Sequence, residues 1–465
     1  MRIRPTIVDA AKHHPPETWL ARSSRDAGRP VPGRSVRPAT RLRSEDMDAP
    51  ALPPAVRVVG YQWAPRSHEV RDFLARNGVH YRWMDLEHGE RGRRLLEEVG
   101  AGTDRLPVLV FRDGTWLAGP ADAEIARRIG LRTEAGHPFY DLVIVGGGPA
   151  GLAAAVYGAS EGLRTILVEK QAPGGQAGQS AGIENYLGFP EGIGGADLAR
   201  RAVAQAERFG VEILAARRVV RVRAEGAYRY ATLDDGEELR CHALLLCTGV
   251  SWRVLDVPGC PPLVGAGVYY GAARAEVHAV RGQDVYLLGG GNSSGQAAML
   301  LSRRARSVTM LVPEASIEEH MSRYLVDRIR DTPAIRVRTG HTVAGAQGDG
   351  RLERITIRDV ESGATESVIA HALFVFIGAV PETDWLEGTV LRDEEGYILC
   401  GAQMLRDEER PAGWPLDRDP YLLETSVPGV FVAGDVRAGS VKRVASAVGE
   451  GSMAVQFIHQ YLHDR

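Results

Sequence analysis

The chain has 465 residues, a formal net charge of −3 at pH 7 and 25% charged residues. A length of this order predicts about three domains, each large enough to have its own core. The balanced charge gives no indication of a nucleic-acid partner or a membrane-surface partner. No apolar run reaches the ~18–20 residues that span a bilayer.

The chain contains four cysteines and no CxxC pair; they are Cys241, Cys247, Cys260 and Cys400. This is not the pattern of a disulfide-rich secreted protein, so a reducing cytoplasm is the expected location. Cys241 and Cys247 lie on one predicted strand, and six residues of strand span about 20 Å. That separation is too large for a disulfide. No metal site is expected.

Residues 1–52 differ in composition from the rest of the chain. They are rich in Arg, Pro and Ser and lack hydrophobic periodicity, which predicts a disordered basic tail. The apolar core of a signal peptide is absent. Either Met1 or Met47 can be the true start, because a chain beginning at Met47 keeps every predicted element.

Residues 53–133 are predicted to form a small α/β domain. The patterns predict three strands and three helices with a hairpin through Asp113-Gly114; the strands cover 56–62, 81–85 and 106–110, and the helices 67–77, 93–99 and 122–129. This domain resembles glutaredoxin, with Pro107 at the position of that family's cis-proline. The resemblance places the redox cysteines at the turn into the first helix, where this chain has Ala64 and Ser67. We therefore expect a packing or docking role without thiol chemistry.

A first dinucleotide-binding fold begins with the buried-strand run 141–145. The loop Gly146-Gly147-Gly148-Pro149-Ala150-Gly151 follows and opens a predicted helix over 152–161. These glycines permit the tight turn, the approach of a pyrophosphate and close helix packing, while the helix N-terminus attracts the phosphates. The next strand, 165–168, ends at Glu169, which can accept a hydrogen bond from an adenosine ribose.

A second dinucleotide-binding fold begins at Asp284. The strand 285–288 leads into Gly289-Gly290-Gly291-Asn292-Ser293-Ser294, followed by a predicted helix over 295–303 and a strand over 308–311. Ser294 stands in the third small position. Two such folds in one chain predict two nucleotide cofactors.

The C-terminal part contains a strand ending in Gly434-Asp435. This ending resembles the site where flavoproteins with two dinucleotide-binding folds place a carboxylate on the ribityl chain of the flavin. A helix is predicted to begin in the segment that runs from Lys442-Arg443-Val444 to Gly451, where its dipole can stabilise reduced flavin.

From about residue 139 to the end, the chain resembles low-molecular-weight thioredoxin reductases. The matching segments are Gly174-Gly175-Gln176, Glu184-Asn185-Tyr186-Leu187-Gly188, Thr248-Gly249, Pro258-Gly259 and 378–383. The resemblance implies an α/β fold of two Rossmann-like domains, with an NAD(P)-binding domain, 258–377, inserted into an FAD-binding domain, 138–257 and 378–465. It also implies FAD, NADH or NADPH as cofactors and a homodimer.

The chain departs from this family at the redox cysteines. Gly271 and Arg274 stand at the two cysteine positions, and Ala275 stands where the family has an acidic acid/base residue. A dithiol relay is therefore not expected, and the bare flavin face would meet the substrate. Its candidate catalytic residues are Tyr270, Arg274, Glu276 and His278, with Tyr269 beside them. Alternatively, Tyr269 and Tyr270 belong to a packed strand and Glu276 is solvated.

The nicotinamide site departs as well. The resemblance implies an Arg pair for the 2′-phosphate of NADPH near Val312-Pro313-Glu314, where this chain has no cation. Glu314 suits a ribose diol, so NADH is favoured. Glu314 can instead be a surface residue, and Arg323 can supply the missing cation.

Three functions follow. The first is an NAD(P)H-dependent flavin oxidoreductase acting on a small molecule or a redox partner protein. The second is a biosynthetic flavin oxidase that uses oxygen, and the third is a non-catalytic scaffold holding FAD. The intact second glycine loop favours the first function over the second, and the complete flavin segments favour either over the third.

Overall fold

The computed structural model describes residues 56–62, 64–87, 89–180, 182–271, 277, 280–405 and 409–465. They all belong to one structural unit, Pro54–Arg465. The predicted tail and the candidates Arg274, Glu276 and His278 lie outside the described residues.

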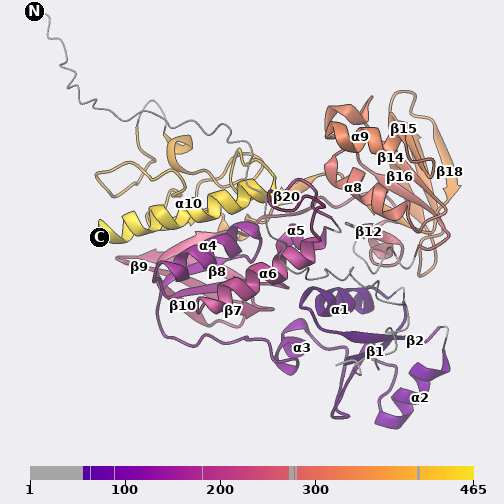
Figure 1. The fold of residues 1–465 in the computed structure, drawn as a ribbon, viewed down its shortest axis with the longest axis horizontal. Coiled ribbons are helices and arrows are strands. Elements are labelled where there is room, and N and C mark those ends of the chain that lie inside the picture. Colours follow the sequence, from indigo (N-terminus) through magenta and orange to yellow (C-terminus); the bar gives the residue numbers. More distant parts are fainter. Residues whose placement is uncertain are drawn as a thin grey trace, which may run out of the picture. The chain divides into compact units, whose positions relative to one another are not determined.

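The N-terminal domain is a four-stranded sheet in the order β2-β1-β3-β4, with β1 parallel to β2 and antiparallel to β3 (Figure 1). Its elements are β1 Val56–Gly60, α1 Pro65–Arg76, β2 Tyr81–Asp85, α2 Glu90–Val99, β3 Val108–Phe111, β4 Trp116–Ala118 and α3 Asp122–Arg128. One apolar cluster joins α1 and α3 to the sheet, and a separate one joins α2 to it. The Leu106–Pro107 peptide bond is cis, as the resemblance implied.

The second sheet runs β7-β6-β5-β10-β9-β8, with β21 added beside β10. Its members are β5 Tyr140–Val145, β6 Thr165–Glu169, β7 Glu212–Ala215, β8 Val219–Glu225, β9 Tyr228–Leu233, β10 Glu238–Leu246 and β21 Val430–Val432. Strands β5, β6, β7, β10 and β21 are parallel. Strands from two separate parts of the chain, residues 140–246 and 430–432, therefore form one sheet.

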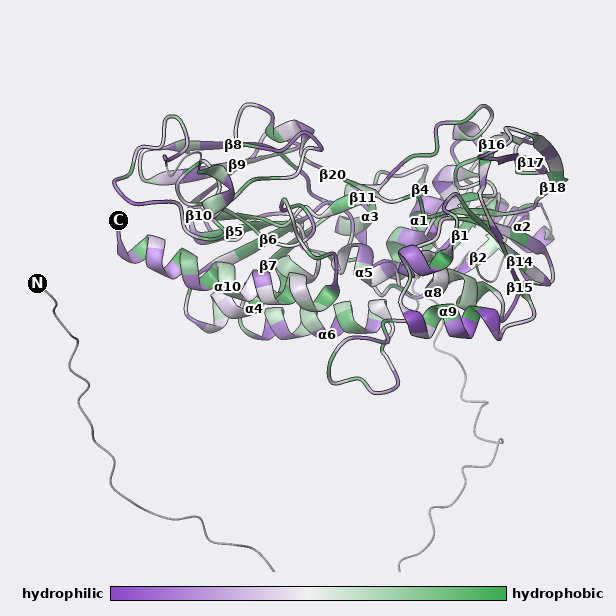
Figure 2. Cartoon of the chain, turned by 90° about the horizontal axis from the view of Figure 1, so that it is seen from above, coloured by the Kyte–Doolittle hydropathy of each residue, from purple (hydrophilic) through white to green (hydrophobic). Residues whose placement is uncertain are grey.

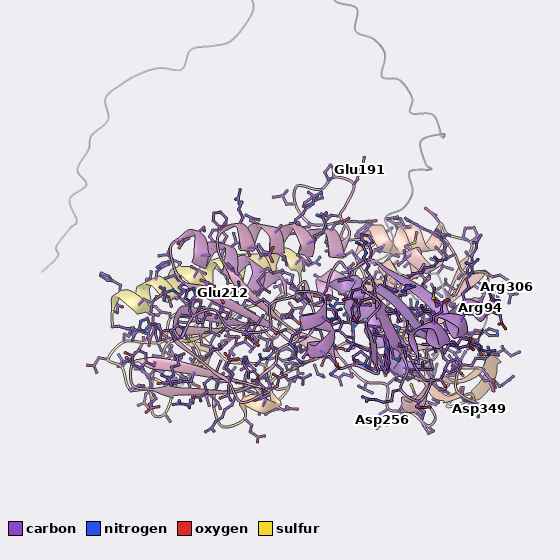
Figure 3. The ribbon with its side chains drawn as sticks, turned by 90° about the horizontal axis from the view of Figure 1, so that it is seen from below. Arg94, Glu191, Glu212, Asp256, Arg306 and Asp349 are labelled. Atoms are coloured by element: carbon purple, nitrogen blue, oxygen red, sulfur yellow. The ribbon has the colours of Figure 1, made fainter. Side chains whose placement is uncertain are left out.

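Helices α4, α6 and α10 lie on one face of this sheet, and the apolar residues of its central strands form the core between them (Figures 1 and 2). The helices of this domain are α4 Pro149–Ser160, α5 Gly175–Gln179, α6 Gly195–Arg208 and α10 Val444–His463. Glu212, labelled in Figure 3, accepts hydrogen bonds from the Gly136 amide (2.8 Å) and the Tyr140 hydroxyl (3.0 Å). These bonds fasten the segment that enters the sheet from the N-terminal domain.

The inserted domain contains a five-stranded parallel sheet in the order β12-β19-β13-β14-β15 and a three-stranded antiparallel sheet β16-β17-β18. Its elements are β12 Val268–Tyr270, β13 Asp284–Leu288, α8 Asn292–Leu301, β14 Ser307–Val312, α9 Arg323–Arg330, β15 Ile335–Thr339, β16 His341–Gln347, β17 Arg354–Asp359, β18 Thr365–Ile369 and β19 Leu373–Val375. Two antiparallel strands, β11 Val250–Trp252 and β20 Ala379–Pro381, carry the chain into and out of this domain.

Short 3-10 helices occupy Pro261–Leu263, Ile317–Glu319, Asp384–Leu386 and Gly401–Met404. No described helix is both long enough and apolar enough to pass through a membrane.

Candidate functional site

The first glycine loop has the backbone that its sequence predicts. Gly146 has φ +105°, and a Cβ on it would lie 2.3 Å from the Cys247 carbonyl oxygen. A Cβ on Gly151 would lie 1.9 Å from the Gly146 carbonyl oxygen, so only glycine fits at either position. Helix α4 begins at Pro149, which needs no hydrogen-bond acceptor there. No atom lies within 4 Å of a Cβ built on Gly148, which leaves room for a phosphate.

Glu169 ends β6 as a buried carboxylate held by two backbone amides. Its Oε2 accepts from the Gly147 N–H at 2.7 Å, and its Oε1 accepts from the Gln171 N–H at 2.9 Å. A carboxylate has about four acceptor positions. Two therefore remain for the hydroxyls of a ribose.

These elements surround a cavity of about 800 Å³. It is lined by every residue predicted for the flavin except Gly151, which packs behind the loop: Gly146, Gly148, Pro149, Ala150, Glu169, Gly175, Gln176, Asn185, Thr248, Gly249, Gly434, Asp435, Lys442, Arg443 and Val444. The structure thus brings together residues that lie up to about 300 positions apart in the chain. Helix α10 begins at Val444, inside the segment predicted for its start, with its N-terminus at this cavity.

The residues of this cavity fit an FAD group. Gln176 Oε1 and Thr248 Oγ1 are buried and have no hydrogen-bond partner among the described residues, and buried polar atoms normally have one. Asp435 follows β21 at the cavity wall, where burial raises the pKa of its carboxyl and the charge of Lys442 opposes that rise. Ribityl and isoalloxazine groups carry the donors and acceptors that these three side chains lack.

The second glycine loop repeats the design of the first. Gly289 has φ +134°, and a Cβ there would lie 2.3 Å from the Phe376 carbonyl oxygen. Ser294 is buried, and its hydroxyl donates to the Gly289 carbonyl at 2.7 Å, so this irregular third position still closes the turn. The Asn292 side chain accepts from the Ser322 amide at 2.8 Å. Of the residues predicted for the nicotinamide cofactor, Asn292 and Ser293 reach the large cavity, whereas Gly289, Gly291, Ser294 and Glu314 do not line it.

Glu314 stands beside this second loop much as Glu169 stands beside the first. Its Oε2 lies 3.2 Å from a Cβ built on Gly290, and the corresponding distance from Gly147 to Glu169 Oε2 is 3.1 Å. Glu314 Oε2 is buried and has no hydrogen-bond partner among the described residues. The side chain therefore points at the glycine loop and is not a solvated surface group. Arg323 is exposed and pairs with Asp327 one turn later on α9, at 3.0 Å.

Tyr269 and Tyr270 belong to strand β12 and line the cavity. The Tyr270 hydroxyl accepts from the Leu255 amide at 2.8 Å, and burial raises the pKa of this phenol. The Tyr269 ring packs against Phe374 and the ring of His68. Both tyrosines therefore belong to a packed strand, as the alternative interpretation predicted. Both also lie at the cavity wall.

The four cysteines are all buried and unpaired. Burial raises the pKa of the Cys241 thiol to about 12 and that of Cys400 to about 11, and it raises the pKa of Cys247 and Cys260 as well. A thiol acts as a nucleophile only as its thiolate. These four side chains are therefore packing groups.

Two parts of the site were missing from the sequence prediction. His68, Asp72 and Arg76, on helix α1 of the N-terminal domain, line the large cavity. Their spacing of four residues places them on one helix face. The sequence therefore predicts a polar face on this helix, but it does not predict that the face lines the cavity. Trp252, at the end of β11, also lines the cavity, and no motif includes it.

The fold and the cavity define a two-domain dinucleotide-binding flavoprotein. Among the described residues, no group of His, Cys, Asp and Glu side chains forms a metal site. Residues 140–451 match the family model of the pyridine nucleotide-disulphide oxidoreductases, and the chain belongs to this family. Members of this family use FAD and NAD(P)H.

The chain is similar to thioredoxin reductases within this family. It is 31% identical to thioredoxin reductase of Treponema pallidum over 323 residues, which are 70% of this chain and 97% of that protein. It is 30% identical to thioredoxin reductase of Peptoclostridium acidaminophilum over 329 residues, again 70% of this chain and 97% of that protein. The crystal structure of Lactococcus lactis thioredoxin reductase, in its FR conformation, matches 70% of this chain and 100% of its own, with 27% identity and a TM-score of 0.63. The family match begins at residue 140, after the N-terminal domain.

Proposed function

We propose that this protein is an NAD(P)H-dependent FAD oxidoreductase that acts on its substrate directly through the flavin and not through a dithiol. The observation that carries the proposal is Gly271. It stands where the thioredoxin reductase resemblance implies the first redox cysteine, and it has φ +96°, a backbone conformation that favours glycine. Cys247 is the one cysteine that lines the cavity beside it; this side chain is buried, its pKa is raised by burial, and it has no second thiol to pair with.

The roles of the chain's own residues follow from their positions. The Gly146 loop and Glu169 hold the adenosine and pyrophosphate end of the FAD, while Asp435, Thr248 and Gln176 bind its ribityl and ring portions. FAD, when bound, supplies the hydride-accepting chemistry. The start of α10 directs its amides and positive dipole end toward the cavity, which favours negative charge there.

NADH is the better donor in this proposal. Glu314 has an unpartnered buried oxygen aimed at the second glycine loop, which suits the two hydroxyls of an unphosphorylated ribose. A 2′-phosphate at this position would meet a carboxylate. Arg323, the alternative cation, is already paired with Asp327.

The N-terminal domain acts as a wall of the flavin cavity and has no thiol chemistry of its own. Arg76 of α1 donates to the Gln171 side chain at 3.0 Å and to the Ala172 carbonyl at 3.2 Å, which ties α1 to the segment after Glu169. Ser67, at the predicted cysteine position, is fully buried. The domain resembles glutaredoxin in sequence but serves as a packing module.

Two measurements on the FAD-loaded protein test the proposal. Anaerobic stopped-flow mixing with NADH or NADPH is expected to bleach the oxidised flavin absorbance. A thioredoxin-coupled DTNB assay is expected to remain at background, because no paired thiols can carry electrons from the flavin. Reductase-like turnover of thioredoxin would overturn the proposal, and a flavin that neither nucleotide reduces would favour an oxidase.

A further inference from the structure

A second, smaller cavity adjoins the flavin cavity. Its volume is about 150 Å³, and the residues that it shares with the larger one are Gln176, Gln179, Ser180, Trp252, Gly271, Ser293 and Gln296. An engineered protein cavity of about this volume binds benzene. The second cavity therefore has room for one six-membered ring.

Trp252 presents an unsatisfied donor at the junction of the two cavities. Its indole Nε1 is buried and has no hydrogen-bond partner among the described residues. The ring is fixed edge-to-face against Phe376, with centroids 5.6 Å apart and planes at 85°. A Cβ on Gly271 would lie 3.8 Å from Nε1, so a side chain at this position would contact the indole edge. A buried N–H in such a place calls for an oxygen acceptor.

Among the described residues, the rest of the lining supplies an apolar wall and one cation without an ion-pair partner. Ala297, Met299, Leu300 and Leu325, from α8 and α9, form the apolar part. Arg328 is committed to Glu184, at 2.7 Å. Arg303 is exposed at the cavity edge, and its guanidinium has no ion-pair partner in the described part of the chain. An uncommitted guanidinium is a ready partner for a carboxylate.

We infer that this second cavity binds a monocyclic aromatic or conjugated carboxylate that carries a second oxygen substituent. Arg303 pairs with the carboxylate, the ring packs against the apolar wall, and Trp252 donates its N–H to the other oxygen. The lining runs along α8 and just past its end, from Ser293 to Arg303, about 15 Å at 1.5 Å per residue. The ligand therefore lies along the helix and beside the second glycine loop, because Ser293 lines both cavities. This inference rests on the proposed function, because it names the substrate class of a flavin without a dithiol.

Calorimetric titration of the FAD-loaded protein tests the site, with perturbation of the oxidised flavin spectrum as a second readout. The probes are 4-hydroxybenzoate, benzoate and the uncharged 4-hydroxybenzamide. The substitution Trp252→Phe should weaken 4-hydroxybenzoate binding about tenfold and leave benzoate unchanged. The substitution Arg303→Gln should weaken both acids about tenfold and leave the amide unchanged. Arg304→Gln is the matched control, since Arg304 is the exposed neighbour that does not line the cavity.

Three results would overturn the site. They are no binding of 4-hydroxybenzoate to the wild-type protein, equal effects of Arg303→Gln and Arg304→Gln, and loss of 4-hydroxybenzoate binding when NAD⁺ is saturating. The last result would make the cavity a nicotinamide subsite. Calorimetry reads binding whether or not a nicotinamide reduces the flavin, so a failure of the proposed function is recognised separately by stopped-flow reduction.

Discussion

Glu169 and Glu314 occupy equivalent positions in the two dinucleotide-binding folds. Each is a carboxylate at or just after the end of a parallel strand, and each faces a glycine loop. The first is held by two amides, and the second keeps one oxygen without a partner among the described residues. Their spacing from the two glycine loops made both predictable from sequence. The side-chain direction of Glu314 was not predictable, because a surface position and a loop-facing position have the same spacing.

Replacing Pro313 and Glu314 together with arginine should shift the nucleotide preference toward NADPH. The change removes a carboxylate that repels the 2′-phosphate and adds two cations that can bind it. Each charged hydrogen bond is worth roughly 1.5–3 kcal/mol, so the ratio of NADPH to NADH reduction rates at low nucleotide concentration should rise at least tenfold. Stopped-flow flavin reduction measures the ratio. An unchanged ratio, with Arg323→Gln lowering NADPH use in the wild type, would assign the phosphate site to Arg323.

Asp435→Ala should weaken FAD retention about tenfold, because a hydrogen bond from a ribityl hydroxyl to a half-buried carboxylate contributes about 1.5 kcal/mol. The flavin-to-protein ratio after dialysis measures the loss. Asp417→Ala is the control, since Asp417 is exposed and does not line the cavity. Equal retention by both variants would remove Asp435 from the FAD site.

At the scale of elements, the glycine loops and the strands before them were predicted, and the helix starts were placed too late. Helix α4 begins at Pro149 and not at 152, and α8 begins at Asn292 and not at 295. Loop residues of these motifs form the first helical turn. Short polar residues and proline are favoured in both loops and first turns, so the boundary cannot be read from composition.

Helix α10 contains two glycines, Gly449 and Gly451, that differ in how closely they approach α4. A Cβ on Gly451 would lie 2.1 Å from the Ala150 carbonyl oxygen, whereas a Cβ on Gly449 meets nothing within 4 Å. Gly451→Ala should therefore separate the two helices and destabilise the protein by about 1–3 kcal/mol. Gly449→Ala should stabilise it by roughly 0.5–1 kcal/mol through helix propensity.

Thermal unfolding of both variants, followed by circular dichroism with FAD in excess, is the measurement. The melting temperature should fall for Gly451→Ala and rise or stay constant for Gly449→Ala. A fall of the same size in both would mean that flexibility of α10, and not its close approach to α4, requires the glycines.

For the whole molecule, the sequence was sufficient to predict an N-terminal α/β unit and an inserted nucleotide domain. It was not sufficient to predict the wall that α1 adds to the flavin cavity or the second cavity. Trp252, Gly271 and Arg303 come from three separate segments and belong to no motif. Their proximity depends on how β11, β12 and α8 pack, which a single sequence does not specify.

Deleting residues 1–46 should leave flavin content and melting temperature unchanged. The apolar clusters of the described residues are built from residue 56 onward, and the deleted segment has no hydrophobic periodicity. The truncated and full-length proteins are compared by absorbance ratio and thermal unfolding. Insoluble truncated protein would show that the segment contributes to the fold.

The backbone at Gly271 also bears on the evolutionary history of the chain. A non-glycine residue held at an unfavourable positive φ costs roughly 1–3 kcal/mol, so a mutation to cysteine there would be disfavoured before any second thiol arose. One cysteine alone relays no electron pair, and the first step back would therefore bring a cost without a benefit. Introducing a dithiol at this position would therefore require a change of backbone conformation at residue 271 together with a second thiol.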